Sequence, residues 1–301
     1  EFRRVLFRSF HINKWDNGEF KGDAISTTSE LVKISSDGNL GLEEGQKFER
    51  GGIYRFTVDV TKGNTKAVLT VEKVGKVDLP APDIFFGNDK MEVTDTDIYK
   101  SDQAFTQGQM ITVTGIDNLN EWWIDPDFFE KQSDGALKFL PINGDYRVTA
   151  NAVLKYFSVM ALKDGKPAKL QDDGTGAIWA IGKGIGKPSV ASSEVGWEPG
   201  KALCLAQVAP KKYQLTLKAG ETLKTSGDWE AISFKFFYQN DWGDEFKNYA
   251  SNTLVEQLKL TDSGNLEMQD NKAFEEGAVY RFTIDVTNGN ANADLKVEKI
   301  N

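Results

Sequence analysis

Histidine and cysteine are almost absent from this 301-residue sequence. His11 and Cys204 are the only residues of their types. A single cysteine excludes an intrachain disulfide, and its place in the apolar run from Ala202 to Ala206 predicts a small buried side chain. A single histidine argues against a Ser-His-Asp triad or a histidine zinc site in the main part of the chain. We therefore expect no catalytic residue, no metal site and no cofactor.

Long apolar runs and phosphate-binding loops are also absent. No stretch approaches the roughly 18–20 apolar residues that cross a bilayer, and no signal peptide is recognisable. The glycine-rich run from Gly182 to Lys187 lacks the spacing of a phosphate-binding loop, so we expect a flexible loop there. The net charge of −9 argues against nucleic acid or an anionic membrane as a partner and leaves neutral ligands open.

A long internal duplication is the main feature that the sequence does contain. Residues 19–73 recur without a gap as residues 245–299, and about half of the paired positions are identical. Both copies contain Gly-Asn-Leu, Tyr-Arg-Phe-Thr, Asp-Val-Thr and Val-Glu-Lys in the same order. A period of this length indicates tandem domains. Tandem domains without an obvious catalytic constellation are typical of multivalent binding proteins, because linked weak sites gain avidity.

The first copy looks truncated. Strand-like sequence precedes the second copy from about residue 178, whereas only a few residues precede the first copy. Residues 1–9 resemble the translation of a sequencing-adapter oligonucleotide, so we expect a scar there; a genuine basic amphipathic N-terminus is the alternative. The shortened copy would expose an apolar face and an open edge, and we predict that it is poorly ordered or aggregation-prone in isolation.

Short alternating segments separated by Gly, Asn and Asp dominate the chain and predict β-strands. In residues 54–60, apolar side chains alternate with Arg55, Thr57 and Asp59, and a second alternating segment follows the turn residues 62–64, which predicts a hairpin. Residues 280–297 repeat this pattern. We therefore predict an all-β protein of tandem antiparallel β-sandwich domains, either Ig-like or similar to carbohydrate-binding modules. The expected parts are a scar (1–9), the end of a truncated repeat (10–75), a middle sandwich (77–175) and a complete last domain (176–301).

Carboxylates are abundant, and a pair of them is sufficient for glycoside hydrolysis, so composition alone does not exclude that chemistry. Asp125 and Asp127 are close in sequence, as are Asp95 and Asp97. Neither pair belongs to the Asp-x-Asp-x-Asp-Gly loop with a distal Glu that would indicate calcium. We expect these residues to be solvated loop charges.

Tryptophan is the most informative residue type. Sugar rings present apolar C–H faces flanked by hydroxyl groups, so a carbohydrate site typically combines an aromatic platform with hydrogen-bonding side chains. Trp197 lies in the turn-like Gly-Trp-Glu-Pro-Gly, and Trp242 follows a strand that ends in Gln-Asn-Asp. For both residues, burial in the core is the alternative.

The other tryptophans are less informative. Trp179 lies in an apolar strand and is expected in the core, whereas Trp229 could be buried or exposed. Trp122 and Trp123 are adjacent, so in extended backbone they face opposite ways and at least one can pack inward. Trp15 occupies the place of Trp242 in the first copy.

Four segments carry a family resemblance: Ala177-Ile178-Trp179-Ala180-Ile181-Gly182, Gly196-Trp197, Phe234-Lys235-Phe236 and Trp242. In this order they resemble the glycan-binding domains of Sus-type (SusE- and SusF-like) surface lipoproteins of Bacteroidetes. The resemblance covers residues 177–301 and, through the duplication, the first copy. The middle part is similar to segments from proteins of the same polysaccharide-utilisation loci.

This resemblance implies β-sandwich domains that capture polysaccharide at the outer membrane or cell surface without catalysis. It makes Trp197 and Trp242 stacking platforms and Lys235 a ligand contact, and we expect Asp241 and Asn240 to bind hydroxyl groups. The expected partners are a polysaccharide or oligosaccharide and other outer-membrane glycan-uptake proteins, and not nucleic acid. The alternatives are a two-carboxylate glycoside hydrolase and a purely structural or adhesive array with buried aromatics.

Overall fold

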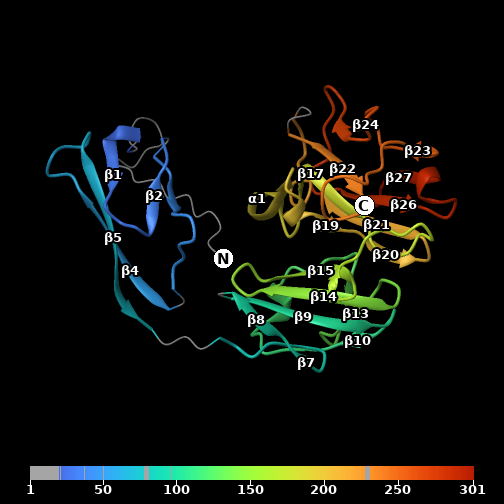
Figure 1. Ribbon diagram of the computed structural model, residues 1–301, viewed down its shortest axis with the longest axis horizontal. Helices are drawn as coiled ribbons and strands as arrows, with labels where there is room; N and C mark the ends of the chain where they lie inside the picture. Colours follow the sequence, from blue (N-terminus) through green and yellow to red (C-terminus); the bar gives the residue numbers. More distant parts are fainter. Residues whose placement is uncertain are drawn as a thin grey trace. The chain divides into compact units, whose positions relative to one another are not determined.

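The computed structural model describes residues 20, 22–36, 38–49, 51–77, 81–95, 97–227 and 231–301. The chain divides into two compact units, Glu1–Ala81 and Pro82–Asn301, which are drawn in Figure 1. The expected scar at residues 1–9, Trp15 and Trp229 lie outside the described residues.

The first unit contains a three-stranded sheet and a hairpin. The sheet has the order β1-β5-β4, with β1 parallel and β4 antiparallel to β5. Its small core includes Ile25, Val32 and Leu69. The elements are η1 (Gly22–Ala24), β1 (Ile25–Thr27), β2 (Val32–Ile34), β3 (Leu40–Leu42), β4 (Gly52–Asp59) and β5 (Ala67–Lys76), and β2 pairs with β3.

The second unit begins with the middle sandwich, residues 82–170. A five-stranded sheet, β16-β15-β14-β9-β8, packs against two small sheets, β10-β13-β12 and β11-β6-β7. Phe139 on β13 lies 4.9 Å from Tyr146 on β14 between ring centroids, which shows the two layers in contact. The strands are β6 (Phe85–Phe86), β7 (Asp89–Lys90), β8 (Glu92–Asp95), β9 (Ile98–Phe105), β10 (Met110–Ile111), β11 (Val113–Thr114), β12 (Phe129–Lys131), β13 (Leu137–Phe139), β14 (Gly144–Asn151), β15 (Tyr156–Lys163) and β16 (Lys166–Pro167), with η2 (Leu119–Glu121) between β11 and β12.

The last sandwich, residues 177–301, has two larger sheets. One has the order β18-β17-β22-β25-β24, with β19 also on β17, and the other has the order β20-β21-β26-β27-β23. The ring of Phe234 on β22 lies 5.5 Å from that of Phe282 on β26, so these sheets face each other across the core. The elements are β17 (Trp179–Gly186), α1 (Val190–Ser193), β18 (Glu194–Gly196), η3 (Pro199–Lys201), β19 (Leu203–Cys204), β20 (Ala206–Ala209), β21 (Lys212–Lys218), β22 (Ser233–Phe237), β23 (Ser251–Thr253), β24 (Leu258–Leu260), β25 (Leu266–Met268), β26 (Val279–Asp285), η4 (Asn290–Asn292) and β27 (Asp294–Lys299).

The predicted all-β fold is confirmed. The alternation in residues 54–60 forms β4, which pairs with β5 as the expected hairpin, and β26 pairs with β27 in the second copy. Side chains of a strand alternate between faces, so a period of two in apolar residues fits a sheet with one buried face. In β26 every second residue is buried in this way, whereas no residue of β4 is fully buried.

The expected flexible loop at Gly182–Lys187 is wrong. Residues 182–186 belong to β17, which pairs with both β22 and β18. Glycine is required here for close approach: a Cβ at Gly182, where φ is +141°, would lie 2.3 Å from Phe234 Cα. The glycines therefore let two neighbouring strands approach β17 closely, and their spacing serves sheet packing.

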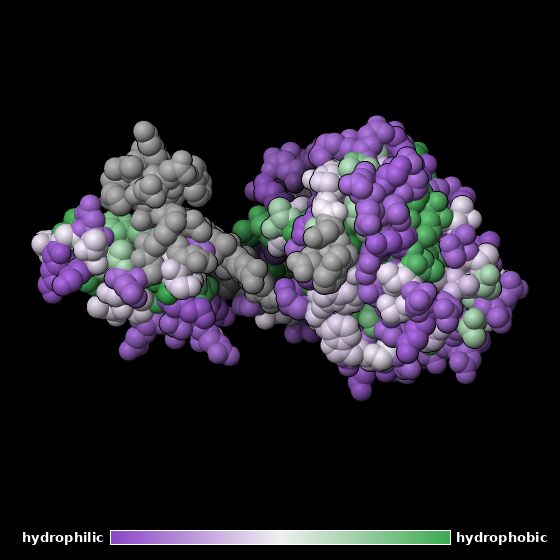
Figure 2. Space-filling view, turned by 90° about the horizontal axis from the view of Figure 1, so that it is seen from above, coloured by the Kyte–Doolittle hydropathy of each residue, from purple (hydrophilic) through white to green (hydrophobic). Residues whose placement is uncertain are grey.

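The two sandwiches of the second unit have separate cores that meet at a junction. Trp179, Cys204 and Ala206 come from strands of the last sandwich but pack in the core of the middle one. The indole nitrogen of Trp179 donates a hydrogen bond to the Ala168 carbonyl at 3.0 Å. Trp179 is buried, as predicted. On the face shown in Figure 2, hydrophilic residues dominate the surface of this unit and apolar residues form small separate groups.

Candidate functional site

A short loop after β22 presents Trp242 to solvent. The side chain is 51% exposed, although it follows a strand whose residues are all buried. The loop closes through a hydrogen bond from the Tyr238 amide to the Asp244 carbonyl, at 2.7 Å. Gly243 and Asp244 both have positive φ, which glycine and aspartate tolerate in turns. The run Asn-Asp-Trp-Gly-Asp therefore ends the strand and turns the indole outward.

Trp197 lies beside Trp242. It follows β18 at Gly196, where φ is +58°, and it packs as a partly buried side chain against the core of the last sandwich. The two indole centroids are 6.2 Å apart with 26° between the ring planes. Phe237 supports Trp242 from the strand with an edge-to-face contact at 5.9 Å. Two residues 45 positions apart thus form one nearly parallel aromatic pair, which we call the tryptophan pair.

The polar residues predicted for this site lie in different environments. Asp241 is exposed and its carboxylate accepts a hydrogen bond from the Trp242 amide at 2.8 Å, and Asn240 is half-buried in the same loop. Lys235 differs from them because its side chain points away from solvent. It is 5% exposed, and its ammonium group lies 3.1 Å from Glu245 Oε1. The structure therefore gives Lys235 an internal ion pair, whereas Asp241 and Asn240 lie next to the tryptophan pair.

Gln239 is a site residue that the sequence analysis missed. Its side-chain amide donates to the Trp242 carbonyl at 2.6 Å, and its side-chain oxygen accepts from Lys169 Nζ at 2.6 Å. Its place next to the loop was visible in the sequence, but its bonds depend on Lys169, 70 positions earlier.

Asp125 and Asp127 form the most unusual ionic cluster among the described residues. The Lys187 ammonium group lies 2.8 Å from both Asp125 oxygens and 2.9 Å from Asp127 Oδ2. Asp127 also accepts hydrogen bonds from the Gln214 side chain and from both the amide and hydroxyl of Thr216, at 2.6–2.7 Å. We call these five residues the lysine–aspartate cluster.

The predicted role of Asp125 and Asp127 as solvated loop charges is therefore wrong. Asp127 is 1% exposed, and the side chain of Lys187 is 7% exposed. Lys187 follows β17, so this cluster joins the loop of the middle sandwich to the sheets of the last one. An ammonium group occupies the position between the two carboxylates, and a bound cation is not needed to neutralise them.

Burial and pairing have opposite effects on the pKa values in the lysine–aspartate cluster. Burial, together with the negative charge of Asp127, raises the pKa of Asp125 despite the lowering effect of Lys187. Burial also raises the pKa of Asp127, but Lys187, Thr216 and Gln214 outweigh that effect and leave it below its ordinary value. Burial lowers the pKa of Lys187, yet the two aspartates more than compensate and raise it. The cluster is enclosed and internally paired, so it has the properties of a structural ion pair rather than a site that reaches substrate.

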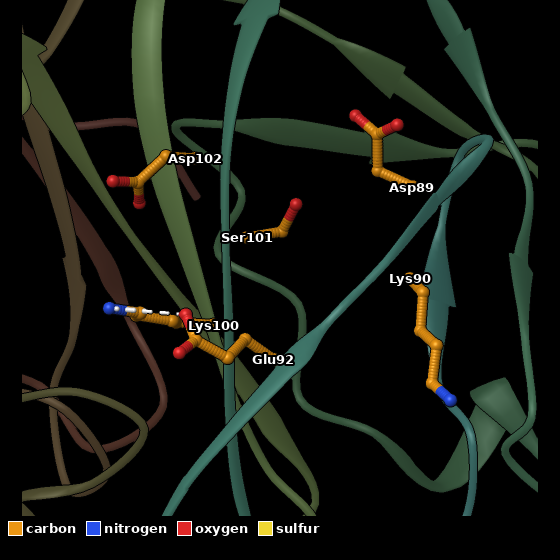
Figure 3. Close-up of a pocket in the computed structure, with 6 residues that line it drawn as sticks. All are labelled: Asp89, Lys90, Glu92, Lys100, Ser101 and Asp102. Carbon is orange, nitrogen blue, oxygen red and sulfur yellow. Dashed lines mark ion pairs between the residues drawn. The ribbon is translucent and has the colours of Figure 1, made fainter.

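A second polar feature is a surface hollow of about 380 Å³ on the middle sandwich. Figure 3 shows its six lining residues, which come from β7, β8 and β9 and include no aromatic ring: Asp89, Lys90, Glu92, Lys100, Ser101 and Asp102. Lys100 pairs with Glu92 at 3.4 Å, and Asp102 pairs with Arg147 at 2.6 Å. The Arg147 hydrogen bond holds the pKa of Asp102 below its ordinary value. Because two of its acids are already paired with cations and no ring offers a stacking surface, this hollow is a weaker candidate than the tryptophan pair.

The adjacent tryptophans of the middle sandwich, Trp122 and Trp123, both have partners within the protein. Trp122 is buried and stacks on Phe157, with centroids 4.6 Å apart. Trp123 is half-buried, and its indole nitrogen donates to Glu221 at 3.1 Å. The prediction that at least one of the two packs inward is confirmed.

The described residues contain neither a metal-type cluster nor a membrane-spanning helix. Within them, no three His, Cys, Asp or Glu side chains are grouped as they would be around a metal ion. No helix in the same part of the chain has the length and apolar character needed to cross a membrane.

The fold and the site define a multidomain all-β protein whose last sandwich carries the tryptophan pair, with Trp242 exposed and Trp197 half-buried. Residues 2–61 and 173–287 match a domain of unknown function, DUF5121, and residues 77–170 match another domain of unknown function, DUF5125. The DUF5121 matches together cover more than half of the sequence, so the chain belongs to the DUF5121 family. No curated protein matches it.

Proposed function

We propose that this protein binds polysaccharide or oligosaccharide without catalysis, and that the tryptophan pair is the stacking surface. The observation that carries the proposal is the exposure of Trp242 beside the nearly parallel ring of Trp197. Two neighbouring indoles with one of them largely in solvent offer a flat apolar surface, and such a surface fits the C–H face of a sugar.

Polar groups next to the rings support a carbohydrate ligand. Asp241 and Asn240 lie in the Trp242 loop and provide acceptors and donors for hydroxyl groups. Lys235 is buried, so in this proposal it supports the strand through Glu245 and does not contact the sugar. Exposed Asp241 and Asp244 give the loop a negative character that favours neutral glycans over anionic ones.

The wider setting is also part of the proposal. The order of elements from residue 177 onward resembles that of Sus-type glycan-binding lipoproteins, and the sandwich fold is compatible with that class. We propose a location at the outer membrane or cell surface, where other glycan-uptake proteins would be partners. Neither DUF5121 nor DUF5125 has a described function that bears on this point.

Affinity electrophoresis in gels that contain soluble neutral polysaccharides tests the proposal. We expect retardation of the wild-type protein on at least one glycan. Trp242→Ala should weaken that binding by about 1–3 kcal/mol, because truncation of a buried stacking contact typically has an effect of this size. Trp197→Ala should have a similar effect, and the double variant should migrate as if no glycan were present.

Leu154→Ala is the matched control, since it removes an exposed apolar side chain of the middle sandwich. It should bind like the wild type. The proposal fails if no polysaccharide retards the wild-type protein. It also fails if the double tryptophan variant is retarded as strongly as the wild type while its melting temperature is unchanged. Release of reducing ends from a bound polysaccharide would instead indicate a glycoside hydrolase.

A further inference from the structure

The loop that carries Trp242 is connected by its hydrogen bonds to the segment that leads out of the middle sandwich. Leu170, in that segment, donates its amide to the Tyr238 carbonyl at 2.8 Å. Its neighbour Lys169 reaches the side chain of Gln239 with its ammonium group. The connecting segment is therefore attached to the beginning of the loop through both backbone and side chain.

Gln239 transmits this attachment to the tryptophan itself. The residue is 9% exposed, so its amide group has few alternatives to the two partners that it has in the protein. It accepts from Lys169 on one side and donates to the Trp242 carbonyl on the other, with both distances 2.6 Å. A Cβ at Gly243 would lie 3.7 Å from Gln239 Nε2, which places the next residue of the loop against the same side chain.

The other contacts of Trp242 do not fix the position of its backbone, which is held by the hydrogen bond from Gln239. The Trp242 amide bonds to Asp241, its own neighbour in the exposed part of the loop. Its ring touches Trp197 and Phe237, which fix the ring plane once the backbone is in place. Residues 238–244 form no helix or strand, so Gln239 is the buried polar group that holds the centre of the loop.

We infer that Gln239 is a positioning residue for the tryptophan pair, and that Lys169 extends this control to the segment joining the two sandwiches. The middle sandwich would then contribute to glycan binding without touching the sugar. The effect on affinity rests on the proposed function, whereas the effect on ring geometry does not.

Circular dichroism measures the ring geometry without a ligand. Indole transitions couple at a centroid distance of 6.2 Å. The difference between the spectra of the wild type and Trp242→Phe gives the contribution of the tryptophan pair, which we expect to be an exciton couplet. We expect a weaker couplet in Gln239→Leu, which lacks both bonds, and in Gln239→Glu, which retains the Lys169 contact but no longer donates to the Trp242 carbonyl. Lys169→Met should cause a smaller loss, and Lys166→Met, an exposed lysine of β16, should cause none.

Affinity for the glycan identified by electrophoresis is the second readout. In Gln239→Leu the Trp242 carbonyl loses its bond from the Gln239 side chain, and a net effect of the size of one hydrogen bond should weaken glycan binding about fivefold, while both stacking rings remain present. Melting temperatures identify any variant that is unfolded, and Lys169→Met changes only an exposed side chain, so at least one variant remains informative.

The outcomes separate the two ideas. An unchanged couplet in folded Gln239→Leu and Lys169→Met overturns the positioning role, whatever the protein binds. A weakened couplet in a protein that binds no polysaccharide retains the positioning role and removes the proposed function. A weakened couplet with unchanged glycan affinity shows that ring geometry does not control binding, and it overturns the inferred contribution of the middle sandwich.

Discussion

At the scale of single residues, Lys187 is the most consequential side chain outside the tryptophan pair. It is the cation that lies between Asp125 and Asp127, and it is almost fully buried. Removing one partner of a buried ion pair leaves uncompensated charge in a poorly solvated place, which is far more unfavourable than losing an exposed pair.

We predict that Lys187→Met lowers the free energy of unfolding by about 3–5 kcal/mol. Lys201→Met, which breaks the exposed pair with Glu198, should change it by less than about 1 kcal/mol. Urea unfolding of both variants gives the comparison. Equal stability of the two variants would mean that the lysine–aspartate cluster does not hold the sandwiches together.

The free thiol of Cys204 is a probe of the contact between the middle and the last sandwich. Burial in the core of the middle sandwich raises its pKa to about 12, and the thiolate is the reactive form. We therefore predict that Cys204 does not react with a thiol reagent at pH 8 in the folded protein and reacts fully in urea. Fast labelling of the native protein would show that the core of the middle sandwich opens where the last sandwich packs against it.

At the scale of elements, a strand or loop could be predicted from the sequence where its cause lies within a few neighbouring residues, and not where the cause is a distant strand. The alternation that forms β4 and β26 is local, so the pattern alone was sufficient to predict the strands. The role of Gly182 was not predictable, because it depends on how closely β22 approaches β17. Without knowledge of how closely β22 approaches, the glycine-rich run at residues 182–187 predicts a loop.

The same contrast applies to the site. The turn-like sequence around Trp197 and the polar run before Trp242 are local signals that made both rings candidates for exposure, with burial as the alternative. Trp242 is exposed, whereas Trp197 is half-buried. Pairing of the two rings, the burial of Lys235 and the bridge through Gln239 arise from strands that meet only in the folded protein. Asp127 and Lys187 are likewise 60 positions apart, so the sequence alone predicted that Asp125 and Asp127 are solvated loop charges.

At the scale of the whole molecule, the two copies of the duplicated segment differ in burial. Val60 of the first copy is 44% exposed, whereas its counterpart Val286 is fully buried. The strand β26 lies between β21 and β27, while β4 is at the end of its sheet within the part of residues 20–77 that the structure describes. The first copy therefore has fewer interactions to protect its backbone.

Hydrogen exchange measures this difference directly. We predict that amides of β4 exchange faster than the matching amides of β26, because local opening is easier where fewer buried contacts must be lost. Peptides from residues 52–59 and 279–285 of the same sample provide an internal comparison. Equal protection of the two strands would show that the first copy is as stable as the last one.

Glycan binding by this protein depends on contact between a sugar and the indoles of Trp197 and Trp242. The most direct measurement is a two-dimensional NMR titration of protein labelled with ¹⁵N at its seven tryptophans, using an oligosaccharide of the glycan that retards it in gels. Single variants assign the indole signals of Trp197 and Trp242. The account predicts that these two signals shift with saturation while those of the buried Trp122 and Trp179 remain in place. Saturable binding that leaves the indole signals of both Trp197 and Trp242 unmoved would contradict the proposed glycan site.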